Sequence, residues 1–234
     1  MKRRLLISLI SIAMLAPLYS QEKKPATENK EVKKAEPEKK EEKKQEQKDK
    51  SYTVYQEIII EDFETTPYTD KNIFFNSTGY QDAKLSIRDT NPAPDGHSKK
   101  YLGVKVKARV GDTFIIKPVK EILIDRYCKS ISVWVYGKNY AGELSMLLMD
   151  ADQRTYKLRV GALNFLGWRK LEVAIPRNVI QLDQFLNQKK FLKILQFQYT
   201  AANREALARW QYFYIDNISA LVRDKYDDKQ SDEW

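Results

Sequence analysis

The residue types that most often carry catalysis are scarce in this chain of 234 residues, which has one His and one Cys. A Ser–His or Cys–His pair would have to use His97, which lies in a stretch rich in Pro, Asn, Asp and Gly that predicts a loop. A general base needs a partner and an orienting group. The sequence also has no Gly-rich phosphate loop and no nucleophile elbow. We therefore expect no enzyme activity.

Two acidic residues could contribute to a calcium site, because Ca²⁺ prefers oxygen ligands. Glu64 follows the first strand-like stretch of the folded region, and Asp216 lies in the last one. In the β-sandwiches of carbohydrate-binding modules, acids at these two places often share a structural Ca²⁺. Glu64 and Asp216 are the candidate ligands, and two simple solvated acids are the alternative. We expect no other metal and no cofactor, since His97 and Cys128 give too few ligands for zinc. A buried structural role is the simplest interpretation of Cys128.

Three strand-like segments have one aliphatic face and one face of a different character. They are residues 131–136, 195–199 and 211–217, and alternation along a strand places their aliphatic side chains in the core. The opposite faces carry the candidate protein-interaction residues Trp134, Tyr136, Gln196, Gln198, Tyr212 and Tyr214. If the three strands are neighbours, these side chains form one aromatic and amide platform. Such a platform suits a protein partner or a stacked sugar, whereas loops covering it would make it a second small core.

The elements that must position these residues are short and strand-like. Apolar and polar residues alternate with period two around Leu85 and Ile87 and again around Val104 and Val106, with turn-forming residues between such stretches. This pattern predicts an all-β fold, an antiparallel β-sandwich or barrel. Residues 177–190 and 201–208 do not follow the pattern and predict a helical turn and a long connection.

The composition divides the chain into four parts. A basic start and an apolar stretch to residue 18 are typical of a secretory signal peptide over residues 1–20, with an uncleaved anchor as the alternative. Residues 21–50 hold 11 Lys, nine acidic residues and no aromatic residue, which predicts a disordered charged tether. Residues 51–222 form the predicted β-sandwich, and residues 223–234 are a charged tail that ends in Trp234.

The net charge of +9 lies largely outside the predicted sandwich. Residues 51–234 have 27 basic and 23 acidic side chains, close to balance. A nucleic-acid-binding protein needs positive charge gathered on a folded face. We therefore expect no nucleic-acid partner. We also expect no membrane span in the mature protein, after removal of the signal peptide.

Three motifs together resemble the spirochaete flagellar filament outer layer (sheath) protein family, FlaA. They are ISVWVYGKNY at 131–140, GALNFLGWRKLEVAIP at 161–176 and FYIDNI at 213–218. The resemblance covers roughly residues 55–222. GWRKL and IDNI also occur in galactose-binding-like carbohydrate modules, so the resemblance implies a galactose-binding-like jelly roll, in which Trp168 would anchor the sandwich. The tether and the Trp234-ended tail have no counterpart that we can match to the family.

The resemblance implies a structural component of the periplasmic flagellum. Such a protein is exported to the periplasm, where it coats a core of flagellin-like subunits together with other sheath proteins and influences filament curvature and stiffness, hence motility. It would assemble with copies of itself or with related sheath proteins. The alternative is a secreted carbohydrate- or peptidoglycan-binding β-sandwich module.

Overall fold

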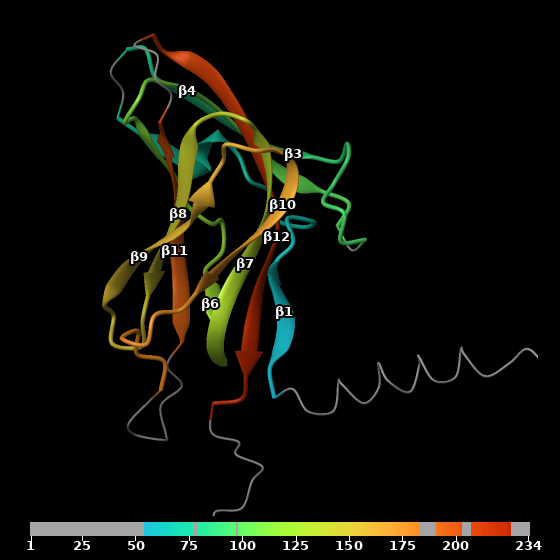
Figure 1. Ribbon diagram of the computed structural model, residues 1–234, viewed down its shortest axis with the longest axis vertical. Coiled ribbons are helices and arrows are strands. Elements are labelled where there is room, and N and C mark those ends of the chain that lie inside the picture. Colours follow the sequence, from blue (N-terminus) through green and yellow to red (C-terminus); the bar gives the residue numbers. More distant parts are fainter. Residues whose placement is uncertain (1–53, 77–78, 97, 183–190, 203–206, 226–234) are drawn as a thin grey trace, which may run out of the picture. The chain divides into compact units, whose positions relative to one another are not determined.

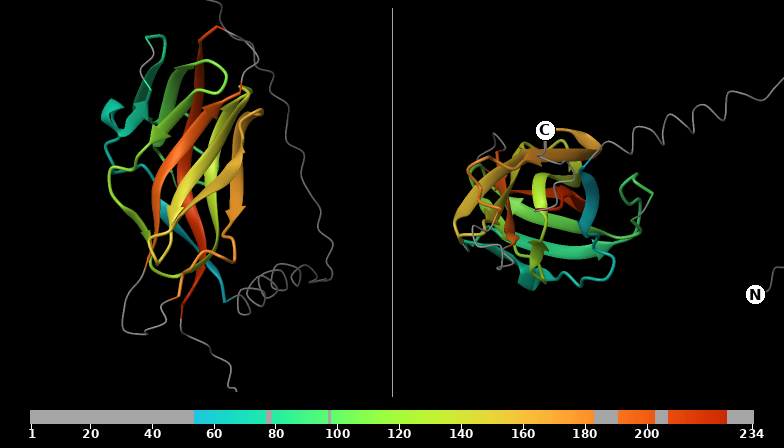
Figure 2. Two further views of the ribbon diagram at one scale, coloured as in Figure 1. Left: turned by 90° about the vertical axis from the view of Figure 1, so that its left-hand side faces the viewer. Right: turned by 90° about the horizontal axis from the view of Figure 1, so that it is seen from below.

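Two antiparallel β-sheets pack face to face in the computed structural model, which describes residues 54–76, 79–96, 98–182, 191–202 and 207–225. Figure 1 labels most of the strands, and Figure 2 (left) shows β8, β9 and β11 side by side from the side of the second sheet. The chain passes repeatedly from one sheet to the other, as in double-sheet jelly rolls. The predicted all-β antiparallel sandwich is confirmed.

The first sheet has the strand order β10-β7-β12-β4-β3, and β1 also pairs with β12. Its strands are β1 (Gln56–Glu61), β3 (Asp82–Arg88), β4 (Tyr101–Ala108), β7 (Tyr127–Lys138), β10 (Leu166–Ala174) and β12 (Arg209–Arg223). Every pairing in it is antiparallel.

The second sheet has the order β2-β5-β11-β8-β9, and β6 pairs with β11. Its strands are β2 (Ile73–Phe75), β5 (Thr113–Ile116), β6 (Ile122–Ile124), β8 (Gly142–Met149), β9 (Thr155–Ala162) and β11 (Leu192–Ala201). A short 3-10 helix, η1 (Asp70–Asn72), precedes β2.

Alternation along the strands explains the core between the sheets. Ile131, Val133 and Val135 of β7 are completely buried, while the residues between them are half-buried on the outer face. The second sheet contributes Phe197 and Tyr199 of β11. Burying these aliphatic and aromatic side chains is the main force that holds the sheets together, at about 25 cal/mol per Å² of apolar surface.

Strand β12 changes its partner halfway along its length. Residues 209–215 pair with β4, and residues 218–222 pair with β1, while β7 pairs with β12 between Tyr214 and Arg223 on the other side (Figure 1). The register shifts between Asp216 and Ile218, and Asn217 has a positive φ of 31°. At this point the loop between β3 and β4 contacts Asp216 and Asn217.

Candidate functional site

The outer face of the first sheet carries a row of aromatic residues across neighbouring strands. Tyr214 of β12 pairs with Tyr136 of β7, and Tyr136 pairs with Trp168 of β10. On the other side of Tyr214, Gly103 of β4 has no side chain of its own, and the Arg88 side chain lies against it. Strands β7 and β12 are therefore neighbours, and they place Tyr136 and Tyr214 on one shared face.

Tyr101 of β4 joins these three rings in a closed cluster, which we call the outer aromatic cluster: Tyr101, Tyr136, Trp168 and Tyr214. Each ring contacts the next at centroid distances of 5.4–5.6 Å, and the planes of neighbouring rings are tilted by 68–86°. Edge-to-face pairs of this kind are favourable beyond the area that they bury. Because successive rings are close to perpendicular, they cannot all offer their faces to one flat ligand.

The loop between β3 and β4 covers part of this cluster. Trp168 donates its indole N–H to the carbonyl oxygen of Asn91 at 3.2 Å, and Tyr101 donates its hydroxyl to the carbonyl oxygen of Thr90. Tyr101 is 5% exposed, and its burial raises its pKa above the usual tyrosine range. The alternative of a second small core under a loop thus describes one side of the cluster. The other side borders a pocket of about 660 Å³ that also contains Arg88 and Lys138.

Lysine side chains extend over the aromatic residues next to this pocket. The ammonium of Lys138 lies 5.7 Å from the ring centre of Tyr214 and 5.6 Å from that of Tyr212. The ammonium of Lys105 lies 5.5 Å from the Tyr212 ring and 4.2 Å from the ring of Trp210. Such cation–π contacts hold cations against the surface while part of their charge still faces outward. The face is therefore both aromatic and basic.

Two of the predicted interaction residues lie elsewhere. Gln196 and Gln198 belong to β11, which pairs with β8 in the second sheet, so they lie on the opposite side of the sandwich from Trp134, Tyr136, Tyr212 and Tyr214. The single six-residue platform is therefore wrong in this respect. Alternation along a strand assigns a face but not a sheet, and β11 also contains a register shift around Leu195.

Several residues of this face were not predicted from the sequence, and one was expected elsewhere. The residues that line or border the pocket include Tyr101, Arg88, Lys105 and Lys138. Of these, only Tyr101 and Lys105 could have been placed there from the sequence, by the alternation along residues 101–107. Trp168 was expected to anchor the sandwich core. It lies on the outer face instead, where it binds the loop at Asn91.

The two candidate calcium ligands do come together, at the point where β12 changes partner. Ser98 Oγ lies 2.9 Å from Asp216 Oδ1 and 3.3 Å from Glu64 Oε1. Asp216 also accepts hydrogen bonds from the backbone N–H groups of Ala93 and Asn217. Glu64 accepts hydrogen bonds from the N–H groups of Lys99 and Lys100. This cluster joins the loop after β1, the loop before β4 and strand β12.

The arrangement of these acids does not fit a calcium ion. Both oxygens of Asp216 already accept protein donors, and the Lys100 ammonium lies 3.0 Å from the carbonyl oxygen of Glu64. Calcium takes six to eight oxygen ligands. In the described part of the chain, no group of three or more His, Cys, Asp or Glu is placed to hold a metal ion. The cluster is better understood as a set of hydrogen bonds that fastens two loops to β12.

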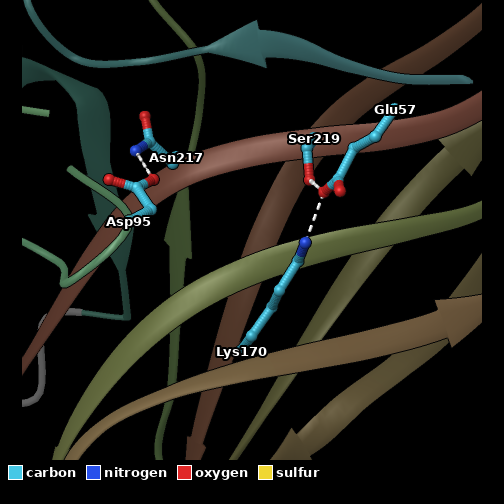
Figure 3. A network of polar contacts seen from close by, with 5 residues as sticks. All are labelled: Glu57, Asp95, Lys170, Asn217 and Ser219. Atoms are coloured by element: carbon cyan, nitrogen blue, oxygen red, sulfur yellow. Dashed lines mark hydrogen bonds and ion pairs between the residues drawn. The ribbon is translucent and has the colours of Figure 1, made fainter. Parts of the chain in front are cut away.

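Further polar contacts tie neighbouring segments to β12 (Figure 3). The Asn217 side-chain amide donates to Asp95, which fixes the loop before β4. Glu57 of β1 accepts a hydrogen bond from Ser219 of β12 and an ion pair from Lys170 of β10. The Lys170 contact lowers the pKa of Glu57, with a smaller contribution from Ser219. These contacts hold the outer face of the first sheet in one arrangement.

The structure describes the single Cys of the chain but not its single His. Cys128 is 1% exposed, and burial raises the pKa of its thiol to about 12, so the expected buried structural thiol is confirmed. His97 lies outside the described residues, as do residues 183–190 and 203–206 of the two non-strand stretches. Among the residues that the structure describes, no helix is long and apolar enough to span a bilayer.

Fold and surface together define an antiparallel β-sandwich whose first sheet has a loop-bordered outer face of tyrosine, tryptophan and lysine. The comparison with known families is more specific. The family model described as flagellar filament outer layer protein, FlaA, matches residues 46–230. The chain belongs to this family, which links it to the outer layer of the flagellar filament.

A curated relative has a name in keeping with this family. It is a putative flagellar filament outer layer-like protein of Brachyspira hyodysenteriae (strain ATCC 49526 / WA1), 30% identical over 127 residues. The match covers 53% of this chain and 58% of the relative, so the chain spans little more than half of that protein.

Solved structures with a similar course of the chain include carbohydrate-binding modules. TmCBM61, in complex with β-1,4-galactotriose, is 15% identical with a TM-score of 0.42, and the match covers 70% of this chain and 94% of that one. The family 11 module of the cellulase Lic26A-Cel5E of Clostridium thermocellum is 10% identical with a TM-score of 0.43, covering 74% and 98%. At these values the likeness carries no argument about function.

Proposed function

We propose that this protein is a structural component of the sheath of the periplasmic flagellar filament. It coats the core of flagellin-like subunits and tunes the curvature and stiffness of the filament, and thereby motility. The observation that carries this proposal is the family match over residues 46–230, which spans the whole β-sandwich. The role is not catalytic.

The proposed route to the filament begins with export. Residues 1–20 direct secretion as a signal peptide, and the protein acts in the periplasm. Its partners there are the flagellin-like core subunits and other sheath proteins, among them copies of itself. Residues 21–50 form a charged tether between the export signal and the sandwich.

We place the contacts with other filament subunits on the outer face of the first sheet. Trp134, Tyr212 and Tyr214 are only half-buried there, although they are large and aromatic. Interfaces are enriched in Tyr, Trp and Arg, and such side chains contribute most of the binding free energy. The hydrogen bonds around Asp216 and Glu57 fix this face before binding, so little ordering is required on assembly.

Single alanine variants test this placement. Trp134→Ala and Tyr212→Ala remove aromatic surface without touching the closed outer aromatic cluster. We expect each to reduce incorporation into filaments by about fivefold or more, since a central aromatic contributes about 1–2 kcal/mol or more to an interface. Phe74→Ala, at an exposed aromatic of the second sheet, is the matched control. Normal incorporation of both first-sheet variants, with the fold intact, would refute the placement.

A carbohydrate- or peptidoglycan-binding role is the second candidate, and the pocket beside the outer aromatic cluster is the observation in its favour. The near-perpendicular rings disfavour a carbohydrate-binding role, because a sugar ring stacks on an aromatic ring whose face is open. Titration of the purified protein with peptidoglycan fragments and common oligosaccharides, followed by Trp fluorescence, separates the two. A saturable change that is lost in Trp168→Phe would favour the saccharide role.

A further inference from the structure

The outer face of the first sheet contains two adjoining depressions with a positive lining. The pocket beside the outer aromatic cluster and a second pocket of about 300 Å³ share Arg88 and Tyr214 in their walls. We call the two together the basic aromatic groove. Gly103 lies in its floor, where a Cβ would come within 3.0 Å of the Arg88 side chain and 3.2 Å of the Ser86 carbonyl oxygen.

Four cations line the groove, and two acids accompany them. The cations are Lys84, Arg88, Lys105 and Lys138, and the acids are Asp70 and Asp89. One oxygen of Asp70 already accepts the backbone N–H of Leu85. Within the described residues, none of the four cations forms an ion pair, while four ion pairs are found elsewhere. An acidic segment with aromatic side chains would complement this lining in charge and in shape.

The chain itself contains such a segment directly after β12. Residues 226–234 hold four acidic residues and one Lys, with Tyr226 at one end and Trp234 at the other. The family match ends at residue 230, so the last part of this segment lies beyond what the family model covers. Residues 21–50, with 11 Lys and nine acidic residues, lack the negative charge that the groove requires. We propose that residues 226–234 of one copy dock into the basic aromatic groove of a neighbouring copy.

Geometry favours the groove of a neighbour over the groove of the same copy. Tyr214 lies in the groove, and β12 continues from it to Arg223, roughly 30 Å away at ~3.3 Å per residue. Strand β12 therefore ends far from the groove, and its direction leads away from it. The eleven residues 224–234 span ~36 Å when extended. After reversing direction, only the last few of them would reach the groove of the same copy, and Asp227 and Asp228 would not lie along the cations.

Docking of this kind joins copies head to tail. The donating surface and the accepting surface differ, so the interface is heterologous, and repetition produces an open chain of subunits unless it closes into a ring. Residues 226–234 would occupy the outer face of the first sheet, where we place the subunit contacts of the proposed function. The docking proposal rests on the proposed function only in this respect. Self-association is measured in purified protein without filaments, so its failure is distinguishable from failure of the sheath role.

Two variants and their mixture test the proposal by sedimentation of the purified protein. One variant lacks residues 226–234 and keeps the groove. The other carries Lys105→Glu and Lys138→Glu and keeps the tail. We expect the unaltered protein to form larger species with increasing concentration at low salt, about 0.05 M, and to lose at least about tenfold in affinity at about 0.5 M. Each variant alone is expected to stay monomeric.

The mixture provides the decisive readout. A tail from the groove variant can enter the groove of the tail-less variant, but no further copy can add to this pair. We therefore expect the equimolar mixture to form a 1:1 dimer and no larger species. Lys120→Glu with Lys157→Glu, at exposed positions away from the groove, introduces the same charge change and is expected to assemble like the unaltered protein.

Three results would overturn the proposal. The unaltered protein could remain monomeric at low salt, or either variant could assemble normally, or the mixture could contain no dimer. Thermal unfolding of each variant checks that the sandwich is intact, and the deletion lies after the last strand, so it leaves the core untouched. If the groove variant instead fails to bind filaments while self-association is unaffected, the groove serves a different partner and the tail proposal is wrong.

Discussion

Asp216 and Glu64 lie in one hydrogen-bonded cluster, yet their surroundings act on them in opposite directions. Burial raises the pKa of Asp216 above its usual range, although hydrogen bonds from Ala93, Ser98 and Asn217 counteract it. The pKa of Glu64 is lowered, chiefly by the hydrogen bond from the Lys99 N–H. The Ser98 hydroxyl has a single proton and lies near both carboxylates, so it can donate to only one of them at a time.

These opposite shifts predict opposite pH dependences for two amide variants. Because the pKa of Asp216 is raised in the folded protein, the ionised side chain lowers the free energy of unfolding at pH values above that pKa. This loss of stability decreases as the pH falls through the folded-state pKa toward the pKa of Asp216 in the unfolded chain. The advantage of the unaltered protein over Asp216→Asn should therefore grow as the pH falls below neutrality. Glu64 contributes stability that is present above its unfolded pKa and is lost as the pH falls, so the advantage over Glu64→Gln should shrink.

Urea unfolding of both variants between pH 7 and acidic pH measures these trends. Equal pH dependence of the two differences in unfolding free energy would contradict the account of the cluster. Asp216→Ala serves as a reference, because it leaves the N–H groups of Ala93 and Asn217 without their acceptor and should cost about 2–4 kcal/mol.

Cys128 should be inert while the sandwich is folded. Its side chain is 1% exposed and its pKa is about 12, so neither access nor the thiolate form is available near neutral pH. We expect labelling by a thiol reagent to be at least about a hundredfold slower in the native protein than in denaturant. Rapid native labelling, or a disulfide between copies in the folded protein, would show that this strand end opens.

At the scale of the strands, two glycines of the second sheet differ in how closely another side chain approaches them. A Cβ on Gly142 would lie 2.2 Å from the Tyr199 hydroxyl, whereas one on Gly161 would lie 3.1 Å from a methyl of Leu171. Tyr199 cannot move aside easily, because it is 1% exposed, packs on Phe213 and donates its hydroxyl to Gln211. The Leu171 side chain is only half-buried and can rotate.

We therefore expect Gly142→Ala to lower the free energy of unfolding by about 2–3 kcal/mol and Gly161→Ala by less than about 1 kcal/mol. Thermal or urea unfolding of the pair is the measurement. Similar losses for both would mean that β8 and β11 can separate at Gly142, and the packing described for this end of the sandwich would be wrong.

The strands also show how far sequence could predict the structure. Alternation located the long strands and their buried faces, as in Ile131, Val133 and Val135. The three-residue strands β2 and β6 are too short to show a period and were missed. Sheet membership was not predictable either, because the pairing of β11 with β8 and not with β12 depends on contacts distant in sequence. That Glu64 and Asp216 lie close together was predicted only by analogy with carbohydrate-binding modules. The hydrogen bonds of this cluster involve Ser98, Lys99 and Lys100, which the sequence did not indicate.

The molecule as a whole is a β-sandwich of the FlaA family with an aromatic and basic outer face on its first sheet. We propose that this face contacts other subunits of the filament sheath. A sheath subunit must be abundant on the filament, because a coat requires copies in proportion to the core. A saccharide-binding protein of the periplasm has no such requirement.

The most direct test is quantitative mass spectrometry of isolated periplasmic flagella, compared with the abundance of the protein in whole cells. We expect strong co-enrichment with the flagellin-like core subunits, at a substantial fraction of their copy number. Absence from isolated flagella, with the protein recovered in the soluble periplasm, would contradict the sheath role.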